Sequence, residues 1–346
     1  MTYGGRPGTG PTAVVFGMIE PPDSPELETV GQRIHRGRSV QVILTVTPNT
    51  ALDITYRVRS LRPHTAHRVT EVTERPGGKG LNVARVLAAL GHEVTVTGFT
   101  GGVTGRALRD QLADTPGVVD ALIPVAGATR RTIAVVDTTT GDSTQLNEPG
   151  PEITPGEWAA FQEAYGVLLR SASAVALCGS LPPGVPVGAY AGLIKAARSA
   201  GVPVLLDTSG EPLRRGVAAR PDLVKPNADE LAELTGSHDP SRATQDARRR
   251  GARAIVASLG PQGLLALTPE GRWHATPPDR EHGNPTGAGD SAVAGLLSGL
   301  VEQLPWPERL TRAVALSAAT VQAPAAGEFD RAAYEKLLAR VSVTAA

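Results

Sequence analysis

The stretch Asn284-Pro285-Thr286-Gly287-Ala288-Gly289-Asp290-Ser291 stands directly before the apolar run 292–297. Small residues at the start of a predicted helix leave backbone N–H groups free to point outward together, where the helix carries partial positive charge. Residues 287–289 therefore predict an anion hole, with Asp290 at its mouth. Phosphoryl transfer needs such donors for the charge on the moving group, and a base for the attacking hydroxyl. A tight turn with Asp290 as a helix cap is the alternative.

Composition describes an ordinary globular chain that fits a reducing compartment. Of its 346 residues, 41% are hydrophobic, and 34 basic residues balance 34 acidic ones. This balance argues against nucleic acid or a membrane surface as a partner. No apolar run approaches the roughly 20 residues that span a bilayer, and the N-terminus lacks a secretory pattern. The single Cys178 lies in an apolar run, which predicts a buried structural thiol and a cytoplasmic protein.

The first 38 residues are rich in Gly, Pro and charge without a sustained period, and we predict a disordered extension there. The folded unit begins at the buried-strand pattern 42–46. Asp53 follows where Pro and Asn break this strand. A carboxylate beyond the C-terminal end of a central strand is where α/β folds place ligand groups. A turn-forming Asp is the alternative.

Two segments of alternating apolar and polar residues, about 54–76 and 128–148, predict half-exposed antiparallel strands. One domain with a small lid explains them better than two hinged domains. Arg130 and Arg131 begin the second hairpin, where adjacent arginines can hold a phosphate. A solvated strand edge is the alternative for this pair.

A second glycine-rich helix start is Gly77-Gly78-Lys79-Gly80, which opens into a predicted helix from Leu81 that Gly91 ends. Glycines with one lysine here predict close backbone approach to an anionic or polyhydroxyl ligand. The pattern is not a phosphate-binding Walker A loop. Residues 98–105 do not match the order of a dinucleotide-binding fingerprint either, which argues against a dehydrogenase.

From about residue 154 the pattern alternates regularly between strands and helices, which predicts a mostly parallel sheet covered on both faces. The predicted strands are 174–178, 204–207, 223–225, 254–259 and 264–267, and the helices are 158–171, 187–200, 228–235, 242–250 and 291–303. Polar or glycine residues follow the strands, along the edge where open α/β sheets bind ligands. They are Gly179-Ser180, Asp207-Thr208, Lys225-Pro226-Asn227 and Gly260-Pro261-Gln262-Gly263.

Together these motifs resemble the PfkB (ribokinase-like) carbohydrate kinase family over residues 41–340. Four motifs fall in family order: Gly77-Gly78-Lys79-Gly80-x-Asn82, Lys225-Pro226-Asn227-x-x-Glu230, Ser258-Leu259-Gly260-Pro261-Gln262-Gly263 and Gly287-Ala288-Gly289-Asp290. The resemblance implies a three-layer α/β/α fold with a mostly parallel sheet and a small β-sheet lid. It also implies ATP and Mg²⁺ as cofactors, and a homodimer formed through the lid.

Further motifs resemble the branch that phosphorylates sugar phosphates, which includes 1-phosphofructokinase and tagatose-6-phosphate kinase. They are 47–53, Thr129-Arg130, 147–151 and Gly179-Ser180-Leu181-Pro182-Pro183-Gly184. Fructose 1-phosphate is the first expected substrate. A tagatose-6-phosphate or 6-phosphofructokinase activity is the alternative. A catalytically silent sugar-phosphate sensor on the same fold is the third interpretation.

The resemblance assigns roles by position. Asp290 is the base, and the backbone of Gly287, Ala288 and Gly289 stabilises the transferring phosphoryl group. Asp53, Gly78 and Asn82 are expected to bind the sugar hydroxyls. Lys79, Arg130 and Ser180 are expected to bind the phosphate that the substrate already carries. The residues expected to bind the nucleotide are Lys225, Asn227, Ser258, Gly260 and Gly263. Glu230 is expected to bind Mg²⁺ through water. The sequence departs from the family pattern in three places. The family's usual Asn-Pro-Ala-Leu-Asp reads Asn49-Thr50-Ala51-Leu52-Asp53 here, and the N-terminal extension has no family counterpart. The Arg130-Arg131 pair leaves open which arginine faces the substrate.

Overall fold

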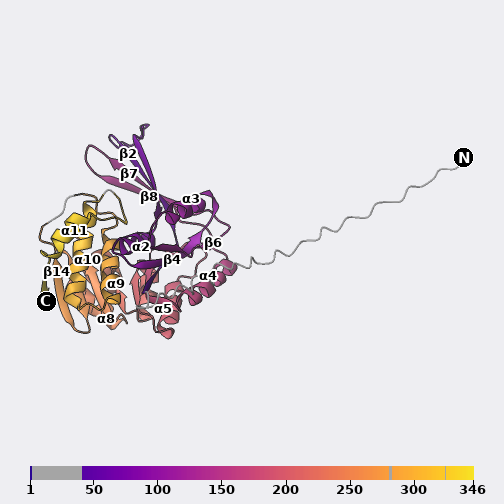
Figure 1. Cartoon of the computed structure of the whole chain (residues 1–346). Coiled ribbons are helices and arrows are strands. Elements are labelled where there is room, and N and C mark those ends of the chain that lie inside the picture. Colours follow the sequence, from indigo (N-terminus) through magenta and orange to yellow (C-terminus); the bar gives the residue numbers. More distant parts are fainter. Residues whose placement is uncertain (2–40, 280–282, 324) are drawn as a thin grey trace. The chain divides into compact units, whose positions relative to one another are not determined.

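Parallel strands form the centre of the molecule, as the alternating pattern predicts. The computed structural model describes residues 1, 41–279, 283–323 and 325–346, so the prediction for residues 1–38 falls almost wholly outside the described chain. Gln41–Ala346 forms one compact unit. Its described strands in the main sheet follow the order β15-β14-β13-β12-β11-β10-β9-β1-β4-β5, with β6 also beside β4. Figure 1 shows this unit, with β14 near the C-terminus and β4 farther across it. Pairing is parallel from β12 to β5 and antiparallel from β12 to β15.

The strands of this sheet lie within a few residues of the predicted ones wherever the sequence predicted a strand. They are β1 (Val42–Thr47), β4 (Glu93–Thr100), β5 (Val118–Asp120), β6 (Ile123–Pro124), β9 (Ala172–Cys178), β10 (Val204–Asp207), β11 (Leu223–Val224), β12 (Ala254–Ser258), β13 (Leu264–Thr268), β14 (Gly271–Thr276) and β15 (Ser342–Ala345). Because the ends of β9, β10, β11 and β12 meet at one edge, the polar residues that follow them are brought together.

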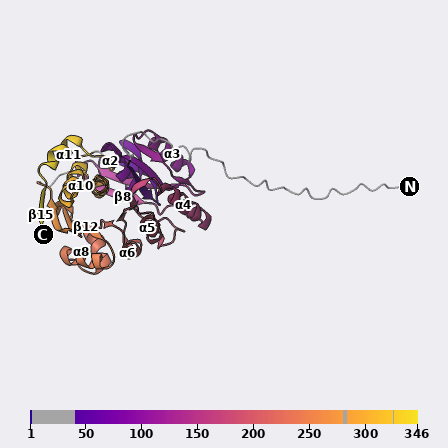
Figure 2. The same cartoon turned by 60° about the horizontal axis from the view of Figure 1, so that its bottom comes forward.

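Helices cover both faces of the sheet, because strand residues alternate between two hydrophobic clusters. In β9, Ala174 and Ala176 pack on one side, and Val175 and Leu177 pack on the other. The first side is covered by α2 (Lys79–Ala89), α3 (Gly102–Ala113), α9 (Ala288–Val301), α10 (Trp306–Val321) and α11 (Arg331–Leu338). The second is covered by α4 (Pro155–Leu168), α5 (Ala189–Ser199), α6 (Gly210–Ala218), α7 (Ala228–Thr235) and α8 (Pro240–Arg249). Figure 2 shows members of the two groups on opposite sides.

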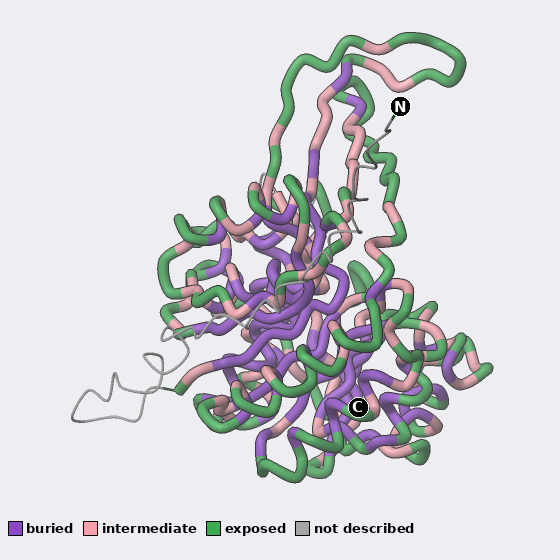
Figure 3. Tube along the Cα trace, turned by 90° about the vertical axis from the view of Figure 1, so that its right-hand side faces the viewer, coloured by how far each residue is buried: buried purple, intermediate pink, exposed green. Residues whose placement is uncertain are grey.

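A second, four-stranded sheet forms the lid, in the order β3-β2-β7-β8. Its strands are β2 (Ala51–Val58), β3 (Glu71–Gly77), β7 (Arg130–Asp137) and β8 (Ser143–Asn147). Two antiparallel hairpins meet through a parallel pairing of β2 with β7. Figure 3 shows this sheet standing apart from the buried core, with mostly exposed or half-buried residues. The small second sheet that the resemblance implied is therefore present.

Some sequence predictions were wrong in detail. Asp53 does not lie in a turn after β1, because β2 begins at Ala51 and places Asp53 inside a lid strand. Helices α6, α10 and α11 were not predicted, nor were the strands β5, β6, β14 and β15. Cys178 is fully buried as predicted, and burial raises the pKa of its thiol. Within the described part of the chain, no helix has the length and apolar character needed to cross a membrane.

Candidate active site

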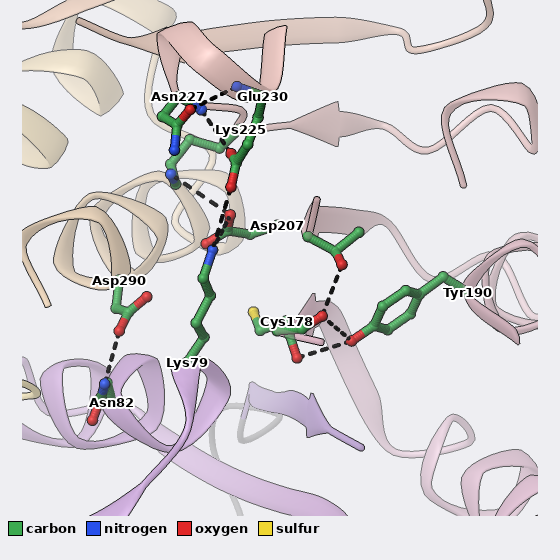
Figure 4. A network of polar contacts seen from close by, with 11 residues as sticks. Lys79, Asn82, Cys178, Tyr190, Asp207, Lys225, Asn227, Glu230 and Asp290 are labelled. Atoms are coloured by element: carbon green, nitrogen blue, oxygen red, sulfur yellow. Dashed lines mark hydrogen bonds and ion pairs between the residues drawn. The ribbon is translucent and has the colours of Figure 1, made fainter. Parts of the chain in front are cut away.

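Asp290 lies in the first turn of α9, behind a left-handed glycine. Gly287 precedes the helix with φ 85°, and a Cβ there would lie 2.8 Å from the Cβ of Ala326, so the turn requires glycine. The side chain of Asp290 is buried. Its Oδ2 accepts a hydrogen bond of 2.8 Å from Nδ2 of Asn82 in α2 (Figure 4). The two glycine-rich helix starts predicted from the sequence therefore converge on one carboxylate.

Burial raises the pKa of Asp290 to about 6. Lys79 opposes this rise, the nearby Asp207 adds to it, and the hydrogen bond from Asn82 again lowers the pKa. A carboxyl group that titrates near pH 6 is ionised at neutral pH, yet remains basic enough to accept a proton from an alcohol during transfer. The electrostatics of the site thus suit a general base.

Charged groups gather beside Asp290 at the carboxyl ends of the strands. Nζ of Lys79, the first residue of α2, lies 3.2 Å from Oδ1 of Asp207 and 4.0 Å from Oε1 of Glu230. Nζ of Lys225, after β11, lies 3.7 Å from the same Asp207 oxygen. Chiefly through Asp207, these carboxylates raise the pKa of Lys79. Two ammonium groups are thus held next to the base (Figure 4).

Asp207 was not among the predicted site residues, although the sequence placed it on the ligand edge. It is 1% exposed at the end of β10, and its Oδ2 has no hydrogen-bond partner. A buried carboxylate oxygen without a partner is costly, which makes it a candidate to receive a donor or a cation. The buried strand end before Thr208 was the signal that could have identified it.

Asn227 and Glu230 form a capping box at the start of α7. Oδ1 of Asn227 accepts from the backbone N–H of Glu230, and Oε2 of Glu230 accepts from the N–H of Asn227, both at 2.8 Å. This local bonding alone explains the Asn-x-x-Glu spacing. It also leaves Oε1 of Glu230 directed toward Lys79, so that Glu230 joins the charged cluster.

The predicted nucleotide loop lies next to this helix start. The N–H of Ser258 donates to the carbonyl of Pro226 at 2.9 Å, which places the loops after β11 and β12 side by side. Gly260 and Gly263 both have positive φ, at 58° and 86°. At Gly263 a Cβ would lie 2.0 Å from the carbonyl oxygen of Ala275, so this glycine is required by packing against β14.

On the lid side, Asp53 and Arg130 lie on neighbouring strands. Burial raises the pKa of Asp53 to about 6, and Arg85 and Arg130 oppose that rise. The guanidinium of Arg130 donates to the carbonyls of Asn49 at 3.3 Å and Glu148 at 3.2 Å. Its neighbour on β7, half-exposed Arg131, instead pairs with the Glu148 carboxylate at 2.8 Å. The structure thus directs Arg130, and not Arg131, toward Asp53.

Ser180 and Gly78 complete the predicted set. Oγ of Ser180 accepts from Nδ2 of Asn49 at 3.1 Å, which ties the loop after β9 to the start of the lid. A cavity of about 490 Å³ adjoins it, lined by Pro149, residues 180–185, Val187, Thr208, Ser209 and Pro212. Gly78 precedes α2 with φ 103°. Sequence reasoning did not select Asn49 as a site residue, although its position inside the motif 47–53 was a signal.

The comparisons with known proteins agree with this arrangement. Residues 46–332 match the model of the pfkB family of carbohydrate kinases. Phosphofructokinase-2 from Escherichia coli is 31% identical in sequence to this chain and superposes on it with a TM-score of 0.80. The match covers 87% of this chain and 98% of the Escherichia coli chain. A Thermotoga maritima protein described as a possible 1-phosphofructokinase is 25% identical, with a TM-score of 0.78 over 88% and 100%. The Escherichia coli protein has also been solved as an inhibited tetramer.

Fold and site therefore define the class: this is a ribokinase-like α/β/α protein with a β-sheet lid. The chain belongs to the PfkB family of carbohydrate kinases, and it is an ATP-dependent sugar kinase. The fold, family and kinase activity that the sequence motifs implied are confirmed. The roles of the individual site residues stay predictions.

Proposed function

We propose that this kinase transfers the γ-phosphoryl group of ATP to the free primary hydroxyl of fructose 1-phosphate. The observation that carries the proposal is the buried Asp290, which is hydrogen-bonded to Asn82 and lies at the helix start that follows Gly287. In this arrangement Asp290 accepts the proton of the attacking hydroxyl. The N–H groups of residues 287–289 stabilise the charge that develops on the phosphoryl group.

An already phosphorylated sugar explains the cationic groups on the lid side of the site. Asp53, Gly78 and Asn82 bind sugar hydroxyls in this proposal, and Arg130, Lys79 and Ser180 hold the substrate's phosphate. Arginine suits this role because its planar guanidinium binds phosphate oxygens in pairs. The nucleotide phosphates lie toward Lys225 and Asn227, with the base moiety beside Ser258, Gly260 and Gly263. Closure of the lid excludes water, which would otherwise compete as an acceptor.

Fructose 6-phosphate is the second candidate. The observation that favours it is that Escherichia coli phosphofructokinase-2, 31% identical, has been solved in complex with this sugar phosphate. Both sugars carry a phosphate at one end and a primary hydroxyl at the other, so the same base and anion hole serve either. The tagatose 6-phosphate alternative belongs with this candidate, because its phosphate occupies the same end.

Magnesium is the expected cofactor. Glu230 and the unpartnered Oδ2 of Asp207 offer carboxylate oxygens, which Mg²⁺ prefers together with water and phosphate ligands. Among the described residues no group of three or more His, Cys, Asp or Glu side chains forms a metal site. This fits an ion bound chiefly through waters and nucleotide phosphates. When bound, Mg²⁺ neutralises negative charge on those phosphates.

The lid supports a homodimer as the assembly. Pairing register places Tyr56, Val72 and Leu146 on one face of the lid sheet, and Asp53 on the other. Val72 is 55% exposed and Leu146 is 57% exposed. Burial of such an apolar face against a second copy removes it from water. The single buried cysteine and the balanced charge support a cytoplasmic location.

ATP consumption with a panel of sugars tests the substrate assignment. The panel is fructose 1-phosphate, fructose 6-phosphate, tagatose 6-phosphate, fructose and ribose. We expect fructose 1-phosphate to lead in kcat/KM by about a hundredfold, which corresponds to about 3 kcal/mol of transition-state discrimination. A leading 6-phosphate means that the sugar enters the pocket reversed. No turnover of any sugar favours the silent sensor and rejects the proposal.

Replacement of Asp290 by Asn tests the base. We expect kcat to fall by roughly a thousandfold while the fold is retained, because the amide keeps the size of the side chain but accepts no proton. Asp110→Asn, on the exposed surface of α3, is the control and should keep wild-type kinetics. Undiminished turnover by the Asp290 variant would remove the base from the mechanism.

A further inference from the structure

Arg85, on α2, hydrogen-bonds to the end of the preceding strand, to its own helix and to a residue 241 positions later in the chain. Its Nη1 donates to the carbonyl of Pro76 at the end of lid strand β3. Its Nη2 donates to Oδ1 of Asn82 at 2.7 Å and to the carbonyl of Ala326 at 2.8 Å. Burial lowers the pKa of Arg85 to about 10, and the neighbouring Asp53 opposes this effect. The group therefore remains a cation at neutral pH.

The contact with Asn82 decides which way its amide points. A guanidinium has only donors, so it can donate to the amide oxygen of Asn82 but has no acceptor for the amide nitrogen. The Nδ2 group is thereby left to face Asp290, where it donates to Oδ2 at 2.8 Å. A reversed amide would place its oxygen against a carboxylate and its N–H₂ against the guanidinium. Arg85 therefore fixes the orientation of the only side-chain hydrogen bond described for Asp290.

The contact with Ala326 reaches the anion hole. Gly287 packs so closely on Ala326 that a Cβ at residue 287 would lie 2.8 Å from the Ala326 Cβ. Two residues further on, Glu328 forms an ion pair with Arg75 of β3. Residues 326–328 are therefore held between the lid strand and the start of α9. The hydrogen bonds of Arg85 connect the same two structures.

We infer that Arg85 is a positioning residue for phosphoryl transfer, acting through Asn82 on Asp290 and through Ala326 on the turn at Gly287. This inference deepens the proposed function and rests on it. Arg85 contacts no reacting atom in this assignment. It sets the direction of the base and of the anion hole, and it links both to the end of the lid strand.

Steady-state kinetics of Arg85→Lys test the inference. Lysine keeps the charge but loses the fork that bridges Asn82 and Ala326. We expect kcat to fall at least about tenfold, because small misplacements of a reacting group are costly. The KM for ATP should stay within about twofold. The matched control is Arg198→Lys, since the guanidinium of Arg198 also donates to a backbone carbonyl, that of Ala219, far from the site. An unchanged kcat in a folded Arg85→Lys protein overturns the inference.

Gly327→Ala displaces the guanidinium without removing it, and it serves if the lysine variant fails to fold. A Cβ at residue 327 would lie 2.5 Å from both Nε and Nη2 of Arg85. The backbone at Gly327 has φ 76°, so alanine also brings backbone strain there. Gly236→Ala controls for that strain, because Gly236 has φ 79° and no atom within 4 Å of a Cβ. A fall in kcat for Gly327→Ala alone supports the inference, and equal kinetics of the two variants contradict it.

A double-mutant cycle with Asn82→Ala separates an indirect role from a direct one. If Arg85 acts largely through Asn82, Arg85→Lys should lower kcat less in the Asn82→Ala background than in the wild type. Fully multiplicative losses overturn the relay through Asn82.

A readout without turnover keeps this inference distinct from the proposed function. The pKa of Asp290 in the folded protein can be read as the pH above which the effect of Asp290→Asn on the free energy of unfolding no longer changes with pH. In the Arg85→Lys background this pH should be higher, because the donor from Asn82 is no longer fixed. An identical pH in both backgrounds overturns the role of Arg85. Failure of the wild type to phosphorylate any sugar would instead overturn the proposed function.

Discussion

At the scale of single residues, the ionised Asp290 that the proposed function needs lowers the stability of the fold. Its pKa is about 6 in the folded protein and 3.8 in an unfolded chain. The group therefore contributes stability that is fully present below pH 3.8 and is lost as the pH rises through 6. We predict that Asp290→Asn is more stable than the wild type at pH 8, by at most about 3 kcal/mol. The difference should shrink as the pH falls to 4.5, which urea unfolding across this range measures.

Asp137 provides a control of opposite sign. Its Oδ1 accepts from Oγ1 and N–H of Thr139 and its Oδ2 from the N–H of Leu61, and these bonds lower its pKa. Its contribution is present above pH 3.8 and is lost only at lower pH. Asp137→Asn should therefore be less stable than the wild type by a constant amount between pH 4.5 and 8. Parallel pH profiles for the two variants would contradict the pKa of Asp290.

At the scale of elements, two capping boxes make one matched comparison. Thr154 caps α4 and Asn227 caps α7 by the same reciprocal hydrogen bonds. We predict that Thr154→Ala and Asn227→Ala each lower the free energy of unfolding by about 1 kcal/mol. Only Asn227→Ala should also raise the KM for ATP, because α7 begins at the charged cluster. Urea unfolding measures the stability of each variant, and initial rates measure its KM for ATP. If the two variants have the same KM for ATP, Asn227 acts only as a helix cap.

Element boundaries followed local signals where those were strong. Helix α7 was predicted with its observed bounds, because Asn227 starts it and Gly236 ends it in the left-handed conformation. Helix α6 was not predicted, because Gly210, Pro212 and Gly216 are poor helix formers and interrupt the helical pattern. A Cβ at Gly216 would lie 2.5 Å from a methyl of Leu206, so packing on β10, which is not visible locally, requires this glycine.

At the scale of the whole molecule, the apolar lid face is the predicted dimer interface. Leu146→Lys places a charge on that face, and we predict that it converts a dimer into a monomer in sedimentation velocity. Gln145→Lys is the matched control, because strand alternation puts it on the opposite face of β8. It should remain a dimer. A Leu146→Lys protein that still sediments as a dimer would locate the interface elsewhere.

The sequence by itself determined the fold class, the two glycine-rich helix starts and the strand-end residues, because turns, caps and hydrophobic periodicity are local properties. It did not determine partners. Asn82 and Asp290 are 208 residues apart, Arg85 and Ala326 are 241 apart, and Lys79 and Asp207 are 128 apart. Adjacent Arg130 and Arg131 looked equivalent until strand pairing directed one toward Asp53 and the other toward Glu148. Only the tertiary structure decides such contacts. They depend on which strand ends meet at one edge of the sheet, and on which polar side chains are buried away from water and must find a partner in the protein.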